Sequence, residues 1–459
     1  ELTTTEPISS VVTQGVVGLD LDFLSRFANF SLTSETNNLL YSHDSEINNN
    51  YLSLNASGAL FLGTNGPELF ASASVGNINR NAANNGIANL ISGDTIQSNS
   101  YTTGIRYNID NSTFSINSSI AYQVNRNEDN IGEFDGMSAS FNANSNNNAR
   151  TGFWQISSSY VTRDQTVSDI KRTSEQYRLD SRFGIITTWK LNPFIRFYDE
   201  DISSNLDSQT QETSPSWGPG IRWLISEHFQ VDLSYNYVTD KTVSDDYVDV
   251  SIQWEPSTRT SLIAGYNKRF FGDSYNLNFQ HATRRLSNSI SYNESLVIFD
   301  RNNFERIDIG SFWCPPNEGL ESIDQCFAFN DQLPVNELQL LDLFTFEPIE
   351  SNSFQLLKNF TWSSKLNLAR TTFSINASAS RREDLETKIA DDTLSASFNI
   401  VRRISGRSNL SIEAKYDYFG FDRSSFSTTN QEDRYNTISA TYDRKLASSL
   451  SAEFTLQQI

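Results

Sequence analysis

Polar and apolar residues alternate along most of this chain in short segments, and this pattern decides the expected fold. In residues 229–238, FQVDLSYNYV, the Phe, Val, Leu and Tyr side chains fall on one face of an extended strand, and the polar side chains fall on the other. Alternation with a period of two predicts β-strands, and no long segment has a dominant helical period. Roughly 21 such segments of about ten residues follow one another, and this is the length that crosses a bilayer at a tilt.

The connections between these segments alternate as well. Short ones read DNST, WKLNP, SEH, EPSTRT, LART and SGRS, and longer polar ones include NRNAANNGIANLISGDTIQSN, TRDQTVSDIKRTS and DISSNLDSQTQETSPS. A soluble β-sandwich, solenoid or adhesin gives no reason for this asymmetry, whereas outer-membrane barrels have short periplasmic turns and long extracellular loops. We therefore expect an all-β fold over residues 1–459: a transmembrane antiparallel up-and-down β-barrel of roughly 20–22 strands in the Gram-negative outer membrane. The sequence FFGDS is short where a long loop is due.

Strand parity leaves the number of strands open. The first and the last clearly alternating segments run in the same direction, so a barrel with an even number of strands needs one more. Either GVVGLDLDFLS, residues 15–25, is a separate strand, or a C-terminal strand lies beyond this sequence. Residue 1 is Glu and Met137 is the single methionine, so we also expect that a secretory signal has been removed.

Composition narrows the alternatives. Only 37% of the residues are hydrophobic and the mean hydropathy is −0.46, yet 12% are aromatic, and disordered chains are poor in aromatic residues. No run of 18 apolar residues occurs, so we expect no transmembrane helix. Aromatic residues, among them Trp189, Trp223 and Trp254, gather near predicted strand ends, as in an interfacial girdle.

The formal net charge is −20 and the sequence pI is about 4.6. This charge argues against nucleic acid as a partner, because phosphates need Lys and Arg. The partners that the fold predicts are outer-membrane lipid and lipopolysaccharide. Divalent cations held between anionic headgroups are a weaker expectation.

The face opposite the predicted lipid side is the expected functional surface. Its many Ser and Asn side chains, mixed with charged ones, suit a water-filled channel and can exchange hydrogen bonds with sugar hydroxyls. The charges have a second interpretation, in which they pair with one another across the lumen and fill it. Strand parity assigns to this face Arg106, Arg178, Asp180, Arg182, Asp232, Asp249, Asn267, Arg269, Glu413, Lys415, Asp417 and Asp443.

Residues 297–352 depart from the alternation. The segment contains both cysteines, several prolines and the apolar run LQLLDLFTF. Long connections are usually functional or disordered. We expect Cys314 and Cys326 to form a disulfide if the protein is exported, with two free thiols as the alternative. The segment is then a long, disulfide-bearing extracellular loop that either gates the lumen as a lid or plug or packs on its neighbours.

The sequence predicts neither an enzyme nor a bound cofactor. The three histidines are His43, His228 and His281, and none has an identifiable nucleophile or metal-ligand partner. His281 shares the apolar face of its strand, where an outer-membrane lipase would place its catalytic histidine. No phosphate-binding loop, haem-attachment motif or EF-hand loop occurs.

One segment of about 40 residues, WEPSTRTSLIAGYNKRFFGDSYNLNFQHATRRLSNSISYNES, resembles the outer-membrane β-barrel family associated with PEP-CTERM/exosortase systems. Matching residues form a turn, a short loop and a following strand end: Trp254, Pro256, Ser257, Arg259, Thr260, Arg269, Phe270, Phe271, Gly272, Arg284, Arg285, Ser291, Tyr292 and Glu294. The resemblance implies that the short FFGDS loop is a feature of the family. Gly272 allows a tight turn there.

This resemblance implies a role in exopolysaccharide export or surface assembly, with polysaccharide and periplasmic export components as partners. It supplies no catalytic residues. The expected function is therefore an outer-membrane channel or scaffold for exopolysaccharide. The alternatives are a general diffusion porin for small solutes and a non-transporting anchor for partner proteins.

Overall fold

A computed structural model describes most of the chain. The described residues are 12–42, 48–63, 66–80, 95–146, 150–167, 170–205, 212–213, 215–239, 245–298, 303–314, 327–328, 339–349, 353–421, 431–446 and 451–458. Their secondary structure is β-strand, without helix. The described part therefore contains no helix with the length and apolarity needed to span a membrane.

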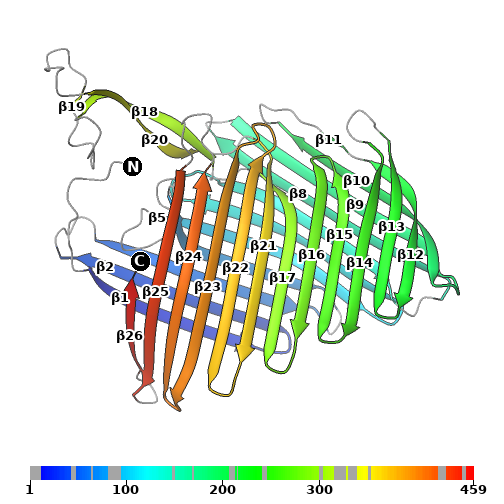
Figure 1. Cartoon of the computed structure of the whole chain (residues 1–459), viewed down its shortest axis with the longest axis horizontal. Coiled ribbons are helices and arrows are strands. Elements are labelled where there is room, and N and C mark those ends of the chain that lie inside the picture. Colours follow the sequence, from blue (N-terminus) through cyan, green and yellow to red (C-terminus); the bar gives the residue numbers. More distant parts are fainter. Residues whose placement is uncertain are drawn as a thin grey trace. The chain divides into compact units, whose positions relative to one another are not determined.

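Most strands belong to one large sheet, in which almost every strand is antiparallel to the next one along the chain (Figure 1). The first half of the sheet comprises β1 (Val12–Leu24), β2 (Ala28–Tyr41), β3 (Asn49–Phe61), β4 (Glu68–Asn79), β5 (Thr95–Asp110), β6 (Phe114–Asn127), β7 (Phe134–Ser145), β8 (Gly152–Val167), β9 (Ile170–Ile185), β10 (Leu191–Ser204) and β11 (Glu212–Thr213). The second half comprises β12 (Ser216–Ser226), β13 (Phe229–Val238), β14 (Tyr247–Ser257), β15 (Thr260–Arg269), β16 (Gly272–Ala282), β17 (Leu286–Val297), β21 (Gln355–Asn367), β22 (Thr371–Asp384), β23 (Ala390–Ser405), β24 (Ser408–Phe421), β25 (Gln431–Lys445) and β26 (Ser451–Gln458).

The sheet has 23 described strands, of which β11 has only two residues, so 22 full strands remain. These strands include β1, which contains the segment GVVGLDLDFLS, so this segment is a separate strand, as one of the two parity alternatives predicts. β17 pairs with β21 and bypasses the segment between them. The prediction of an all-β, antiparallel, up-and-down fold is confirmed.

The chain divides into two compact units. One comprises residues 1–105, 122–135 and 299–351, and it contains β1–β4 and a small sheet. The other, called here the meander unit, comprises residues 106–121, 136–298 and 352–459 and contains the ladders from β8 to β17 and from β21 to β26.

The small sheet lies in the long segment that departs from the alternation. β18 (Asn303–Cys314) pairs antiparallel with β20 (Gln339–Ile349) and with the short β19 (Phe327–Ala328). The apolar run LQLLDLFTF thus forms most of β20. Cys314 is buried at the end of β18, whereas Cys326 lies outside the described residues. The disulfide and the lid or plug therefore stay predictions.

One expected loop is strand instead. Most of TRDQTVSDIKRTS lies in β8 and β9, whose ladder continues to the pair Val167–Ile170. The ladder pairs every residue from Gly152–Ile185 to Val167–Ile170 without a register shift, so backbone pairing continues although the side chains are polar. The short connection between β15 and β16 agrees with the sequence: Phe270 and Phe271 form it, and Gly272 has a φ of +117° that favours glycine.

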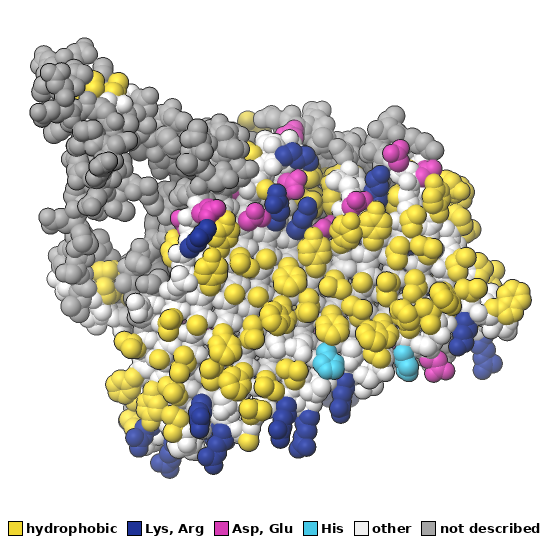
Figure 2. All heavy atoms as spheres, in the orientation of Figure 1, with side chains coloured by type: hydrophobic (Ala, Val, Ile, Leu, Met, Phe, Trp, Pro, Cys, Tyr) yellow, Lys and Arg dark blue, Asp and Glu magenta, His cyan; other side chains and the backbone are white. Residues whose placement is uncertain are grey.

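The faces of the meander unit are the reverse of those in a soluble sheet. On β13, Leu233 is 50% exposed, whereas Asp232 and Asn236 are at most 2% exposed. Exposed apolar side chains recur on the same face of β12, β14, β21 and β23–β25, and Figure 2 shows hydrophobic side chains as a continuous band across the strands. An apolar band on the outside of an antiparallel meander is the surface that lipid covers in transmembrane barrels. The fold is that of an outer-membrane β-barrel.

Candidate functional site

The sheet of the meander unit turns sharply at β12, and glycine makes this possible. Gly218 and Gly220 occupy successive inward positions of the strand, which are buried, while Trp217 and Ile221 point outward. A Cβ atom at Gly218 would lie 1.8 Å from the carbonyl oxygen of Tyr235. Without side chains on its concave side, β12 lets the neighbouring strands approach one another. Glycines commonly mark such corners in sheets.

Side-chain contacts between distant strands confirm the turn. Arg182 on β9 reaches Asp249 on β14, and Arg196 on β10 reaches Asn267 on β15. Each pair of strands is four steps apart in the ladder, about 19 Å in a flat sheet. An Arg and an Asp or Asn side chain cannot span this distance together. The inner faces of β8–β10 and β13–β15 therefore lie against each other.

Three arginines and three aspartates fill the space between these faces, and we call this group the charged seam: Asp180, Arg182, Arg196, Arg222, Asp232 and Asp249. Arg182 Nη1 lies 2.9 Å from Asp232 Oδ2, and its Nη2 lies 3.1 Å from Asp249 Oδ1. Arg222 binds both oxygens of Asp232, at 2.8 and 2.7 Å. Arg196 binds both oxygens of Asp180, at 3.1 and 2.7 Å, and Asp249 Oδ2 at 3.3 Å.

A second group extends the charged seam toward the long-loop end. Arg269 on β15 binds both oxygens of Glu200 on β10, and the Tyr198 hydroxyl donates to Glu200 Oε2 at 2.7 Å. The Arg269 guanidinium also lies over the ring of Phe271, 4.5 Å from its centroid. The arginine of the predicted family motif thus points inward and bridges two facing strands.

The charged seam closes this part of the interior. Arg196 has no exposed surface, and Asp232 and Asp249 are at most 4% exposed. Its three positive and three negative charges balance, and each carboxylate lies within 3.6 Å of two guanidinium groups. Balanced pairing is what allows charges to be buried. A cavity of about 220 Å³ beside Arg178 and Tyr266 is lined in part by the seam residues Asp180, Arg182, Arg196 and Asp249.

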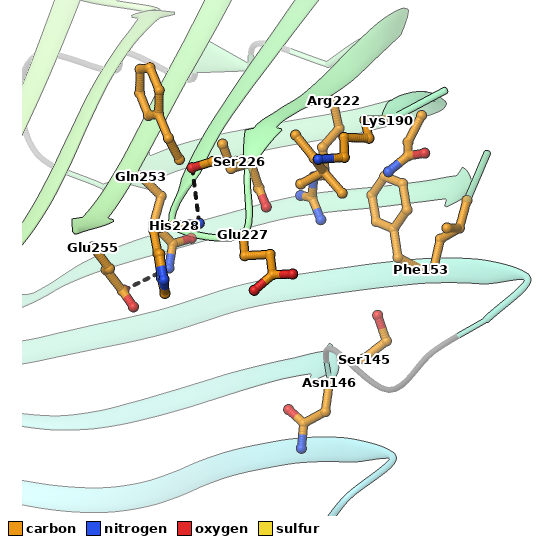
Figure 3. A pocket seen from close by; sticks show the side chains of 15 residues that line it. Ser145, Asn146, Phe153, Lys190, Arg222, Ser226, Glu227, His228, Gln253 and Glu255 are labelled. Atoms are coloured by element: carbon orange, nitrogen blue, oxygen red, sulfur yellow. Dashed lines mark hydrogen bonds between the residues drawn. The ribbon is translucent and has the colours of Figure 1, made fainter. Parts of the chain in front are cut away.

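A larger cavity of about 540 Å³ lies at the short-turn end of the seam (Figure 3). Arg222 connects the charged seam to this cavity. Its guanidinium binds Asp232 in the seam and stacks on Phe153 in the cavity lining, 4.0 Å from the ring centroid. Most of the remaining lining is polar: Ser145, Asn146, Lys190, Asn192, Ser226, Glu227, His228, Gln230, Gln253 and Glu255. Figure 3 shows Gln253 and Glu255 side by side, joined by a hydrogen bond of 2.9 Å.

The structure separates the sequence-predicted lumen residues into groups. Asp180, Arg182, Asp232, Asp249 and Arg269 come together in or beside the seam, covered by partners rather than open to water. Arg178 lies over the Tyr198 ring, and Asn267 contacts Arg196. On β24, Lys415 pairs with Asp417 at 2.9 Å, with Glu413 half-buried nearby on the same face. Asp443 is half-buried on β25, and Arg106 is exposed on β5.

Sequence reasoning missed Arg196, Glu200 and Arg222. On β10 the inner face carries Phe194 and Tyr198 as well as Arg196 and Glu200, so aromatic residues occur on both faces and hide the parity. The signal that was available is the pair of glycines two residues apart in WGPGIRW, which marks the corner and thereby the strands that face each other.

The resemblance segment forms two successive hairpins from β14 to β17. His281 Nδ1 lies 2.8 Å from the Thr260 hydroxyl of the paired strand, so this histidine has a structural partner. Among the described residues, no group of three His, Cys, Asp or Glu side chains is placed to hold a metal ion.

No protein-family model and no curated protein matches the chain. Solved structures with a similar course include the FrpB iron transporter from Neisseria meningitidis, with 8% identity over 97% of this chain and 75% of that one and a TM-score of 0.43. The siderophore receptor PirA from Acinetobacter baumannii has 9% identity over 98% and 76%, with a TM-score of 0.39. The copper transporter OprC has 9% identity over 98% and 75%, with a TM-score of 0.37. At such values the fold assignment rests on the chain's own strands, pairings and faces.

Proposed function

We propose that this outer-membrane barrel is a passage or scaffold for an exopolysaccharide. The observation that carries the proposal is the inner face of β21–β23, which is uncharged along most of its length and open where the charged seam is closed. Thr361, Ser363, Asn376 and Ser378 are exposed on this face, and the ladder places Ser363 opposite Asn376 and Thr361 opposite Ser378.

Hydroxyl and amide groups in rows suit a sugar polymer. Each such group both donates and accepts hydrogen bonds, as sugar hydroxyls do, so a chain can exchange partners as it moves. Neighbouring hydroxyls already pair across strands, for example Ser380 with Thr393 at 2.7 Å. Small side chains keep the face flat, and the absence of charge on most of it avoids fixing one sugar residue in place.

Two further features support the proposal. The amide- and carboxylate-lined cavity of Figure 3 lies at the short-turn end, which is the periplasmic end in transmembrane barrels. The segment around Arg269 and Gly272 resembles the barrels of exosortase systems. A general diffusion porin is a weaker candidate, because the seam occupies part of the interior with fixed ion pairs. A non-transporting anchor is the third candidate.

Paired substitutions on opposite faces of the same strands test the proposal. Ser363→Leu with Asn376→Leu changes the inner face, and Ser364→Leu with Ala377→Leu changes the lipid face at the neighbouring positions. The measurement is binding of neutral glucan and uronate oligosaccharides to the purified protein in detergent, followed by isothermal titration calorimetry. Each lost hydrogen bond is worth about 0.5–1.5 kcal/mol, so the inner-face variant should bind at least about five-fold more weakly.

The lipid-face variant should bind as the unchanged protein does. Equal binding by both variants, or no oligosaccharide binding at all, would contradict the proposal. Planar bilayers separate the porin alternative: a porin conducts steadily, whereas a gated passage is nearly silent until polymer or a partner is added. An anchor neither conducts nor binds sugar, and it co-purifies with a periplasmic protein.

A further inference from the structure

Positively charged side chains are concentrated at the short-turn ends of β14–β26, although the chain as a whole is acidic. Although the net charge is −20, nine cations lie at five consecutive short turns. We call them the basic belt: Arg259, Arg284, Arg285, Arg370, Arg402, Arg403, Arg407, Arg444 and Lys445. All nine are exposed. Figure 2 shows Lys and Arg in a row along one border of the apolar band, with Asp and Glu mostly along the other.

The cations at the two borders differ in their partners. At the long-loop end, Lys358, Arg381 and Arg434 each pair with a carboxylate at 2.7–3.6 Å. Within the described residues, no side chain of the basic belt forms an ion pair. Glu255, Asp443 and Glu453 lie on the inner face of these strands, which Arg403 and Lys445 share by strand parity, whereas Arg402 and Arg444 lie on the opposite face. Within the described part of the chain, the belt's charge is thus not neutralised by the protein's own carboxylates.

The belt also lies where lipid headgroups would be. Arg402 and Arg444 occupy outward positions: Arg402 is opposite Leu410 and Arg444 is opposite Ala452 in the ladders. Beside them, Ile404 and Leu446 are each at least half exposed. A guanidinium that follows an apolar outward face along the strand lies at the depth of the phosphates.

We infer that the basic belt binds the phosphate groups of anionic phospholipids in the periplasmic leaflet. Eight of its nine members are arginines, whose planar guanidinium binds phosphate with two parallel hydrogen bonds. The short turns assign the belt to the periplasmic side, so its lipid is a phospholipid rather than lipopolysaccharide. The inference rests on the fold and is independent of what the barrel carries. Such contacts fix the vertical position of the barrel and give it a preference among lipids.

Fluorescence quenching in reconstituted vesicles tests the inference. The seven tryptophans of the full chain report which brominated lipid surrounds it. Brominated phosphatidylglycerol should quench at several-fold lower mole fraction than brominated phosphatidylcholine, and 0.5 M KCl should reduce the difference because salt screens exposed charges. The belt variant is Arg285→Gln/Arg370→Gln/Arg402→Gln. The matched control removes three cations from the other border: Lys358→Gln/Arg381→Gln/Arg434→Gln.

We expect the control to keep the preference for phosphatidylglycerol. In the belt variant this preference should fall at least five-fold, because one cation near an anionic surface strengthens binding by about five-fold. Equal quenching by the two lipids in the unchanged protein would overturn the inference, as would an equal loss in the control. A third arm adds lipopolysaccharide to the vesicles. If lipopolysaccharide displaces brominated phosphatidylglycerol from the unchanged protein and not from the belt variant, the belt faces the outer leaflet and the assignment is wrong.

Discussion

Replacing Arg196 by Met removes the most buried cation of the charged seam and leaves its carboxylate partners in place. Asp180 then keeps only the Arg182 Nε, 3.6 Å away, and Asp249 keeps the Arg182 Nη2 at 3.1 Å. Three carboxylates would share two guanidinium groups in a largely buried site. Removing one partner of a buried ion pair costs about 3–5 kcal/mol. We expect the free energy of unfolding of Arg196→Met to fall by that amount.

The measurement is urea unfolding of the protein in phosphatidylcholine vesicles, followed by tryptophan fluorescence. Lys358→Met is the control, because Lys358 forms a half-exposed pair with Glu383 at 3.6 Å and should cost about 0–1 kcal/mol. The double variant Arg196→Met/Asp180→Asn restores the balance of charge, and its loss should be smaller than the sum of the single losses by about 1–3 kcal/mol. A loss below about 1 kcal/mol in Arg196→Met, or strict additivity in the double variant, would refute the idea that the seam is a closed, charge-balanced core.

Three further predictions concern the corner, the two faces and the cysteines. Gly218→Ala places a Cβ atom against the Tyr235 backbone and should cost about 1–3 kcal/mol in the same unfolding assay, whereas Gly76→Ala on β4, with nothing within 4 Å, should cost under 1 kcal/mol; equal losses would mean that the corner does not need glycine. Single cysteines can be placed in a chain whose native cysteines are replaced by Ser. Ser378→Cys should react with a water-soluble maleimide much faster than Asn236→Cys or Leu233→Cys, because Asn236 is covered by the seam and Leu233 by lipid. Fast labelling of Asn236→Cys would show an open seam. The predicted Cys314–Cys326 disulfide requires that maleimide shifts the unfolded protein on a gel only after reduction, and a shift without reductant would show free thiols.

Much of the fold was readable from the sequence because strand parity is a local property. In β13 each apolar side chain is separated from the next by one polar residue, so Leu233 and Asp232 are assigned to opposite faces without knowledge of any other strand. The lengths of the connections are local as well. They predicted the up-and-down order of the strands and which strand ends carry short turns and which carry long loops. The sequence also predicted the short loop at Phe270 and Phe271, because FFGDS leaves few residues between two alternating segments.

The charged seam was not readable, because it depends on how sharply the sheet bends. Parity places Asp232 and Asp249 inside, but it cannot say whether water or another strand meets them. That depends on Gly218 and Gly220, whose missing side chains let β9 and β14 come together. Curvature is a collective property of several strands, and one alternating segment carries no trace of it. The open alternatives for the inner charges, a wet wall or mutual pairing, therefore could not be separated before the contacts were known.

The division of the inner face bears on selectivity more than any single residue does. In the meander unit, the arginines and aspartates of β9–β15 neutralise one another and are covered, so they present little field to a solute. The exposed part, on β21 and β22, offers hydroxyls and amides instead, such as Ser363 and Asn376. The cations at the two borders of the apolar band differ as well. Those at the long-loop end form ion pairs, whereas those of the basic belt form none among the described residues. A passage arranged in this way discriminates by width and hydrogen bonding, and its strong charges serve to hold the protein in shape and in the membrane. In the function that we propose, the hydroxyls and amides of this wall bind a hydrated polymer with a hydroxyl on nearly every carbon.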